Sequence, residues 1–256
     1  MVQPPPCDLD IQQFQWIESQ TNDNDRRALL SIREAVCRDV GAYHYLEVGS
    51  HLGGSLQPHV IDSRCRKIYS IDPRPLEQPD ERWVTNYKYN GNSTQRMLDL
   101  LARIPGADLS KLFTFELSSW EISAISITPA ADFAFLDGEH VNSTVIRDFH
   151  AVKKFLSPSS ILAFHDSFIV PKAILRIRRE LRRKGIKHGF YYFPDSTVVA
   201  ITFDPDRFTE TLVCFGWQTK LPLSHWPSLK MQLVKRFPRT MSAARAIKRM
   251  VKGAPQ

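Results

Sequence analysis

Short apolar runs alternate with helix-forming segments along most of the chain. Five runs have the length of β-strands, at 43–48, 67–71, 112–117, 132–136 and 161–164. In 132–136 the apolar residues follow one another instead of alternating with polar ones, which is typical of a strand buried on both faces of a parallel sheet.

Helical patterns lie before and between these runs. Residues 8–40 are predicted to be helical, with Asp23 or Asn24 as the N-cap of a helix. Further elements are predicted as helices after Ser93, over 144–156 and from Pro171 to Gly185, and as an antiparallel pair at 190–193 and 198–203. Strands and helices in this order indicate βαβ units and a parallel sheet.

Composition fits one soluble domain with a full core. The chain has 256 residues, of which 43% are hydrophobic and 24% charged, and no apolar run approaches the roughly 18 residues of a membrane-spanning helix. The first residues show no signal-peptide pattern. The four cysteines (Cys7, Cys37, Cys65 and Cys214) are too far apart in the sequence for a zinc pair, so we expect reduced thiols and a cytoplasmic protein.

The net charge of +7 is unevenly distributed. Residues 171–256 hold 18 Lys and Arg against 5 Asp and Glu, a net charge of +13, whereas residues 1–170 carry −6. A basic C-terminal third favours a polyanionic partner, either a membrane surface or nucleic acid, although a solvated helical face gives the same composition. We expect a main domain at 1–222 and a basic amphipathic segment at 223–256.

A glycine-containing motif follows the first predicted strand. Gly49 allows a tight turn and close approach of a ligand to the backbone, and Gly53 with Gly54 lets a helix begin nearby with its amides facing the ligand. The G-x-G-x-x-G pattern of dinucleotide sites and the Gly-Lys-Ser/Thr of P-loops are both missing. Asp72 follows the second strand, 23 residues after Gly49, where a carboxylate can accept hydrogen bonds from ribose hydroxyls, although a turn-forming role beside Pro73 is the alternative.

A second polar group follows the fourth and fifth predicted strands. Asp137 and His140 leave one strand and His165 and Asp166 leave the next, so all four are expected at one edge of the sheet. Such a set suits a general base, a divalent metal, or both. His140 and Asp166 can also be helix caps, and we expect Asp148 and His150, on the following helix, to be surface residues.

The glycine motif and Asp72 together resemble the cofactor site of class I S-adenosylmethionine methyltransferases. This resemblance implies an α/β, Rossmann-like, doubly wound and mostly parallel seven-stranded sheet with a closing antiparallel strand. It also implies that Glu47 organises the loop, that Asp72 holds ribose, and that the end of the third strand contacts adenine. The implied cofactor-binding residues are Glu47, Gly49, Ser50, Gly53, Ser55, Asp72, Leu117, Ser118 and Asp137.

The motif Asp137-Gly138-Glu139-His140 resembles a narrower branch of small-molecule O-methyltransferases, which includes sugar and macrolide enzymes. The resemblance implies that Asp137 and Asp166 bind Mg²⁺ or another divalent cation and that His140 is the base. Position 165 is His where those enzymes have a second acid, and imidazole is a poorer magnesium ligand than carboxylate. A site of Asp137, His165 and Asp166 is therefore expected to hold a weaker or softer metal, or none.

These expectations lead to one preferred function and two alternatives. The preferred function is methyl transfer to a hydroxyl oxygen of a small molecule or glycan, with Asp137, His140 and Asp166 as the catalytic residues. The alternatives are an RNA methyltransferase, suggested by the basic segment, and a non-catalytic nucleoside-binding protein. In 241–252 the apolar residues share one helical face, a pattern that suits peripheral contact with an anionic membrane or packing on the body of the protein.

Overall fold

A computed structural model of the protein describes residues 9–81 and 86–220. The predicted basic segment 223–256, including the predicted helix at 241–252, lies outside these residues. Within them, no helix is long and apolar enough to cross a membrane. Cys37 and Cys65 are buried thiols and Cys214 is an exposed one.

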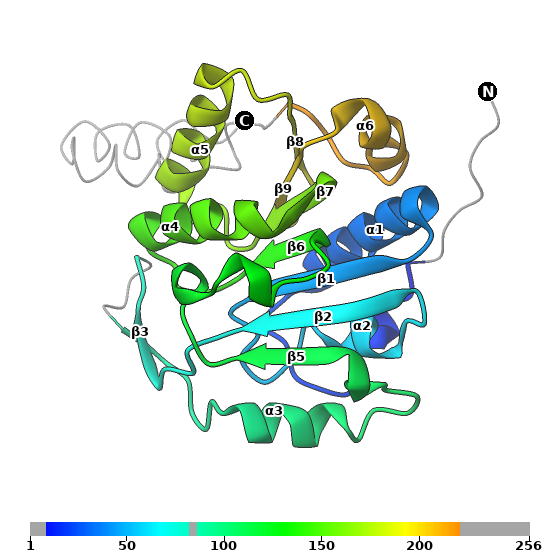
Figure 1. Ribbon diagram of the computed structural model, residues 1–256, viewed down its shortest axis with the longest axis vertical. Coiled ribbons are helices and arrows are strands. Elements are labelled where there is room, and N and C mark those ends of the chain that lie inside the picture. The colour runs from blue at the N-terminus through cyan, green and yellow to red at the C-terminus, as the bar shows by residue number, and fades with distance from the viewer. Residues whose placement is uncertain (1–8, 82–85, 221–256) are drawn as a thin grey trace, which may run out of the picture. The chain divides into compact units, whose positions relative to one another are not determined.

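A seven-stranded sheet forms the centre of the protein (Figure 1). Its strand order is β5-β2-β1-β6-β7-β9-β8, and only β9 runs antiparallel to its neighbours. The strands are β1 Tyr43–Val48, β2 Cys65–Ile71, β5 Leu112–Phe115, β6 Ala131–Leu136, β7 Leu156–Phe164, β8 Gly189–Tyr192 and β9 Val199–Thr202. The predicted α/β sheet with a closing antiparallel strand is confirmed.

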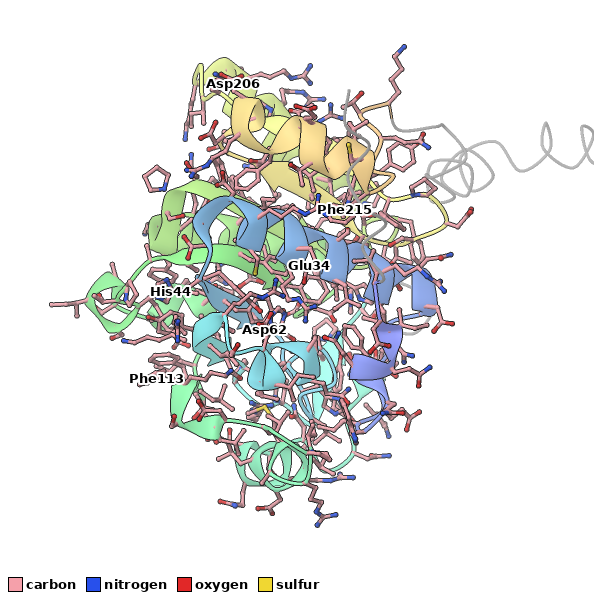
Figure 2. The ribbon with its side chains drawn as sticks, turned by 90° about the vertical axis from the view of Figure 1, so that its right-hand side faces the viewer. Glu34, His44, Asp62, Phe113, Asp206 and Phe215 are labelled. Carbon is pink, nitrogen blue, oxygen red and sulfur yellow. The ribbon has the colours of Figure 1, made fainter. Side chains whose placement is uncertain are left out.

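Helices cover both faces of the sheet. On one side lie α1 (Asp23–Val40), α2 (Gln57–Ile61) and α6 (Pro205–Cys214), which face the viewer in Figure 2, and on the other lie α4 (Asn142–Val152) and α5 (Pro171–Arg183). The helix α3 (Thr94–Leu101) packs Met97 and Leu101 into the same apolar cluster as α1. Because both faces are covered, the central strands are apolar on both sides.

Ion pairs join α1 to the start of β2 on the face shown in Figure 2. Glu34 of α1 and Asp62, which follows α2, both accept hydrogen bonds from the Arg64 guanidinium, at 2.6 and 2.8 Å. Arg33 adds a second cation, 2.9 Å from Glu34 and 3.5 Å from Asp62. These bonds fix α1 against the sheet, which matters for the site because the first turn of α1 contributes to it.

The structure corrects several local expectations. The N-cap of α1 is Asn22 and not Asp23 or Asn24, because the Asn22 side chain accepts the N–H groups of Asn24 and Asp25. Only a short helical turn, Ile11–Phe14, precedes α1 in the predicted helical region from residue 9 onward. The sequence patterns also missed α6 and a small hairpin of β3 (Glu77–Pro79) and β4 (Asn86–Lys88).

Candidate active site

The candidate residues meet because the parallel strands end in register. Val48 of β1 pairs with Ile71 of β2 on one side and with Leu136 of β6 on the other. In the same register Ile71 pairs with Phe115 and Leu136 pairs with Phe164. The next residues of these strands therefore lie along one edge of the sheet: Gly49, Asp72, Glu116, Asp137 and His165. The chain continues from β1 toward β2 on one side and returns to β6 on the other, and open α/β sheets bind ligands at such a switch point.

Gly49 is required at the turn after β1. It has φ of +90°, and a Cβ atom there would lie 2.3 Å from the backbone oxygen of Asp137. Its neighbour His51 also has a positive φ, of 43°, which is uncommon for a residue with a side chain. The turn after β1 and the turn after β6 are thus packed backbone against backbone.

Glu47 lies near the end of β1 and is hydrogen-bonded to the glycine motif that follows. Its carboxyl group is fully buried and accepts hydrogen bonds from the hydroxyls of Tyr45, at 2.7 Å, and Ser55. Burial raises the pKa of Glu47 to about 8, against the lowering effect of these two hydrogen bonds. The Ser55 bond joins the strand to the far end of the glycine motif.

Asp72 is buried at the end of β2 and faces the same turn. Its carboxylate accepts the backbone N–H of His51 at 2.8 Å and that of Arg74 at 2.7 Å. The Arg74 guanidinium lies 3.3 Å from the carboxylate and also donates to the backbone oxygen of His51. Asp72 therefore has the turn-forming role that the sequence offered as an alternative. It also lies at the edge of the sheet where a ligand would bind.

The residues predicted to lie near adenine follow β5, which ends at Phe115 and not at Leu117. Leu117 is 44% exposed, and Ser118 begins a short helical turn in which Glu121 accepts the Ser118 N–H at 2.8 Å.

Ser119 donates its hydroxyl to Asp148 at 2.6 Å. Asp148 was expected on the surface, which is wrong: it is buried on the inner side of α4, and burial raises its pKa to about 6.

Two histidines and three carboxylates gather after β6 and β7. The Nε2 atom of His140 lies 3.1 Å from Asp166 and 3.6 Å from Asp137, and its Nδ1 lies 3.6 Å from Asp80. All of these side chains except that of Asp137 are at most one tenth exposed. The predicted convergence of Asp137, His140 and Asp166 is confirmed as geometry, and Asp80 joins them from the segment after β3.

The ring of His165 lies between two carboxylates. Its Nδ1 is 2.8 Å from Oδ1 of Asp137, and its Nε2 is 3.4 Å from Oδ2 of Asp25 in the first turn of α1. Burial alone would lower the pKa of His165, but the charge of Asp137 and the hydrogen bonds to both carboxylates raise it well above its usual value. Burial raises the pKa of Asp137, but the charges and hydrogen bonds of His165 and His140 lower it by more. The pKa of Asp137 is therefore lowered to about 2.

Magnesium fits this donor set poorly. The described groups whose atoms lie within 4.8 Å of one another are Asp137, His140 and His165, whereas the sequence suggested Asp137, His165 and Asp166. Magnesium prefers octahedral oxygen ligands, and this set offers one carboxylate and two imidazoles. Zn²⁺ and similar ions accept imidazole and carboxylate ligands together, so Asp137, His140 and His165 would suit such an ion better, with Asp25 accepting the second ring N–H of His165.

A small pocket connects the glycine turn with these groups. Gly49, Ser50, Gly54, Ser55, Asp137 and His140 line it, together with residues to which the motifs assigned no role: Glu18, Ser19, Gln20, His51 and Tyr89. Tyr89 packs edge-on against the His51 ring, with 5.1 Å between the ring centroids. The Nε2 atom of His51 is buried and makes no hydrogen bond within residues 9–81 and 86–220.

Three contributions escaped sequence reasoning for identifiable reasons. Asp25 looks like an ordinary acid in the first turn of a helix, and it does form a capping box with Asn22. Asp80 follows a strand of three residues, which is too short to detect from periodicity. His51 stood inside the glycine motif, but its left-handed conformation is visible only in the structure.

Comparison with known proteins gives a family match over the middle of the chain. Residues 46–167 match the model of a family described as a methyltransferase domain. An uncharacterized protein of Acanthamoeba polyphaga mimivirus is 22% identical over 125 residues, which are 48% of this chain and 50% of that protein. The match therefore spans half the length of this curated relative.

Solved structures with a similar arrangement include methyltransferases at low identity. The calicheamicin methyltransferase CalS11 gives a TM-score of 0.48 and 16% identity, over 71% of this chain and 80% of that one. A putative caffeoyl-CoA O-methyltransferase from Staphylococcus aureus gives 0.48 and 16%, over 76% and 95%. The mycinamycin-pathway methyltransferase MycE, solved with Mg and SAH, gives 0.45 and 14%, over 72% and 55%. These similarities are too distant to assign a substrate.

The assignment rests on the sequence match and the sheet. The matched residues run from β1, through the glycine turn and Asp72, to the turn after β7. The strand order puts the glycine turn after β1 at the position where doubly wound sheets bind ligands. Residues 46–167, just under half of the chain, are therefore assigned to this methyltransferase-domain family.

Proposed function

We propose that this methyltransferase transfers the methyl group of S-adenosylmethionine to a hydroxyl oxygen of a small molecule or glycan, with His140 as the general base. The observation that carries the proposal is one pocket lined by both the glycine turn and His140. A hydroxyl is a weak nucleophile while it keeps its proton, so a base beside the cofactor loop is the group that this chemistry requires.

Carboxylates surround the ring of His140 and fix its position. Three carboxylates, of Asp80, Asp137 and Asp166, lie 3.1–3.6 Å from its ring nitrogens. These acceptors hold the ring in place beside the cofactor loop, where a base has to be positioned. Asp166 is the closest and we assign it the role of orienting the ring.

Cofactor binding is assigned to the other side of the pocket. The bound sulfonium supplies an electrophilic methyl group. Asp72 is proposed to hold the ribose, Leu117 and Ser118 the adenine, and the turn at Gly49 to Ser55 the methionine end. Binding both reactants in one pocket converts a bimolecular encounter into a positioned one, which contributes several kcal/mol to such reactions.

The test is methyl transfer from isotopically labelled S-adenosylmethionine to a panel of sugars, phenols and macrolides, analysed by mass spectrometry. A hydroxyl acceptor methylated by the wild type and not by His140→Ala supports the proposal. Methylation only on nitrogen or carbon, or equal turnover by both proteins, contradicts it.

RNA is the second candidate acceptor, and one surface favours it. Lys172, Arg176, Arg179 and Arg183 of α5 are all exposed and, at spacings of four, three and four, share one face of the helix. A row of cations attracts a phosphate backbone. Including total RNA in the same labelling assay separates this acceptor from small molecules, and a protein that binds the cofactor but methylates neither class is a nucleoside-binding protein.

A further inference from the structure

The helix α5 carries a narrow row of cations on the side that faces away from the sheet. This cation row consists of exposed residues one helical turn apart: Lys172, Arg176, Arg179 and Arg183. With 3.6 residues per turn, the four positions fall within roughly 60° of one another and almost opposite Ile177 and Leu181, which are buried. None of the four forms an ion pair with residues 9–81 or 86–220. Their charges are therefore not neutralised within this part of the chain.

The neighbouring helix α4, which packs beside α5 on the same face of the sheet, extends this basic surface (Figure 1). Arg147 is exposed on α4, and its guanidinium lies 3.7 Å from the centroid of the ring of Trp120, which is also exposed. The two acids of these helices add little opposing charge, because Asp148 is buried and Glu180 accepts a hydrogen bond from Lys184 at 2.6 Å. The outward surface of the two helices is therefore basic.

Apolar side chains are exposed on the same surface. Leu175 lies beside the cation row and is exposed, although leucine in an amphipathic helix usually faces the core. An exposed leucine adds nothing to the binding of phosphate groups, but it gains free energy when it leaves water for an apolar phase. Cations beside an exposed leucine and tryptophan are typical of helices that lie in a membrane interface. We call this surface the α4–α5 face, which comprises the cation row, Arg147, Trp120 and Leu175.

Charge and stacking distinguish the possible partners of this face. Residues 221–256 contain eight Lys and Arg and no Asp or Glu, so this segment has the same sign of charge as the face and does not complement it. The cation row also attracts RNA, but single-stranded bases stack on open aromatic rings. The helix α5 has no aromatic residue, and Arg147 covers one face of the Trp120 ring. An anionic lipid surface matches both the cations and Leu175.

We propose that the α4–α5 face docks on an anionic lipid surface. The cations contact the anionic headgroups, and Leu175 and Trp120 reach the boundary with the acyl chains. The face begins near the candidate active site, since the N–H of Ala173 in the first turn of α5 donates to the side chain of Asn142 at 2.7 Å, and Asn142 follows the turn after β6. The proposal goes beyond methyl transfer and does not depend on which acceptor is methylated.

The first experiment measures co-sedimentation of the full chain with phosphatidylcholine vesicles that contain or lack phosphatidylserine, at low salt. Arg176→Glu/Arg179→Glu is expected to weaken binding to the phosphatidylserine vesicles by at least about tenfold, because each cation near such a surface adds to the attraction. The matched control is Arg66→Glu/Arg103→Glu, which lowers the net charge equally at two exposed arginines, in β2 and directly after α3. This control should lose roughly threefold at most, through long-range attraction alone.

A second experiment separates lipid from RNA. Leu175→Ser keeps every cation, so binding to phosphatidylserine vesicles is expected to fall by roughly threefold to tenfold, while any binding to single-stranded RNA, measured by fluorescence anisotropy, stays within about twofold. Loss of RNA binding in Arg176→Glu/Arg179→Glu with unchanged vesicle binding would assign the face to RNA and overturn the proposal.

Three further outcomes would overturn the proposal. The wild-type protein could ignore phosphatidylserine vesicles at low salt, which decides the matter without any variant. The two double variants could lose vesicle binding equally, which would make net charge the cause and not the α4–α5 face. Finally, Arg176→Glu/Arg179→Glu could abolish self-association of the protein, measured by analytical ultracentrifugation, and leave vesicle binding unchanged, which would assign the face to a second copy of the chain.

Discussion

The Nε2 atom of His140 lies 3.1 Å from Oδ2 of Asp166, and Asp166 is held in a left-handed conformation with φ of 46°. A non-glycine residue in this region is uncommon and carries a conformational cost. The turn after β7 therefore directs this carboxylate toward an imidazole that belongs to the turn after β6.

His140→Ala is expected to lower the rate of methyl transfer by roughly 10²–10⁴, the usual contribution of a general base. The affinity for S-adenosylhomocysteine should stay within threefold of wild type, because the proposed role concerns the proton of the acceptor. Rapid-quench turnover and calorimetry measure the two effects. A collapse of cofactor affinity with little effect on the rate of the bound complex would make His140 a structural residue.

Asp72→Ala is expected to weaken S-adenosylhomocysteine binding by about 1–2 kcal/mol, or roughly 5- to 30-fold, through loss of hydrogen bonds to a charged acceptor. Calorimetry measures this change. Asp132→Asn is the matched control, since Asp132 lies at the start of β6, where it accepts the His44 N–H at 2.9 Å. Equal affinity in both variants would remove Asp72 from the cofactor site.

Gly49→Ala is expected to destabilise the fold by about 2–5 kcal/mol, because it combines a left-handed side-chain penalty with a backbone clash. The clash is with Asp137, whose backbone oxygen would lie 2.3 Å from the new Cβ. Gly106→Ala separates the two causes, since Gly106 has φ of +77° and no atom within 4 Å of its Cβ position. Denaturant unfolding should give only about 1–2 kcal/mol for this control. Equal losses would show that the two turns are not packed together.

The pH dependence of stability should report on Glu47. The folded protein keeps the proton of Glu47 up to about pH 8, whereas the unfolded carboxyl releases it near its model value of 4.5. Across this interval the folded state binds more protons, so its stability falls as the pH rises, by at most about 1.4 kcal/mol per pH unit from this group. Glu47→Gln should remove that part of the slope in urea titrations from pH 5 to 9. An unchanged slope would show that Glu47 ionises normally.

The basic residues at the C-terminal end of the sequence predict binding to anionic membranes. Residues 221–256 contain eight Lys and Arg and no Asp or Glu. We expect the full chain to float with anionic vesicles at low salt and a chain ending at residue 220 to do so less, since each cation near an anionic surface contributes about 1 kcal/mol. Neutral vesicles are the control. Equal flotation of both chains would move the proposed membrane contact away from this segment.

Much of the fold followed from pattern because its strands are buried on both faces. The predicted strand at 43–48 coincides with β1, and the predicted start of the helix at Pro171 is that of α5. Parallel strands of known order bring their ends to one edge, so the meeting of Asp72, Asp137 and His165 could also be predicted.

The rest depended on contacts that periodicity does not encode. Asp25 acts through packing between segments about 140 residues apart, and its sequence context is that of an ordinary helix start. Asp148 lies on the inner side of α4, and the polar partner that makes its burial tolerable, Ser119, is 29 positions away. Such pairs are set by the tertiary structure, and each member alone resembles a surface residue.

The absence of a side chain at Gly49 has a practical consequence for redesign. Because the turns after β1 and β6 touch through their backbones, neither can be lengthened or reshaped without moving the other. Attempts to change acceptor preference therefore have more freedom in the peripheral walls of the pocket, at Gln20 and Tyr89, which belong to surface loops. In a mutational library, diversity placed at those two positions should preserve expression, whereas diversity at 48–50 and 137–138 should be lost as unfolded protein.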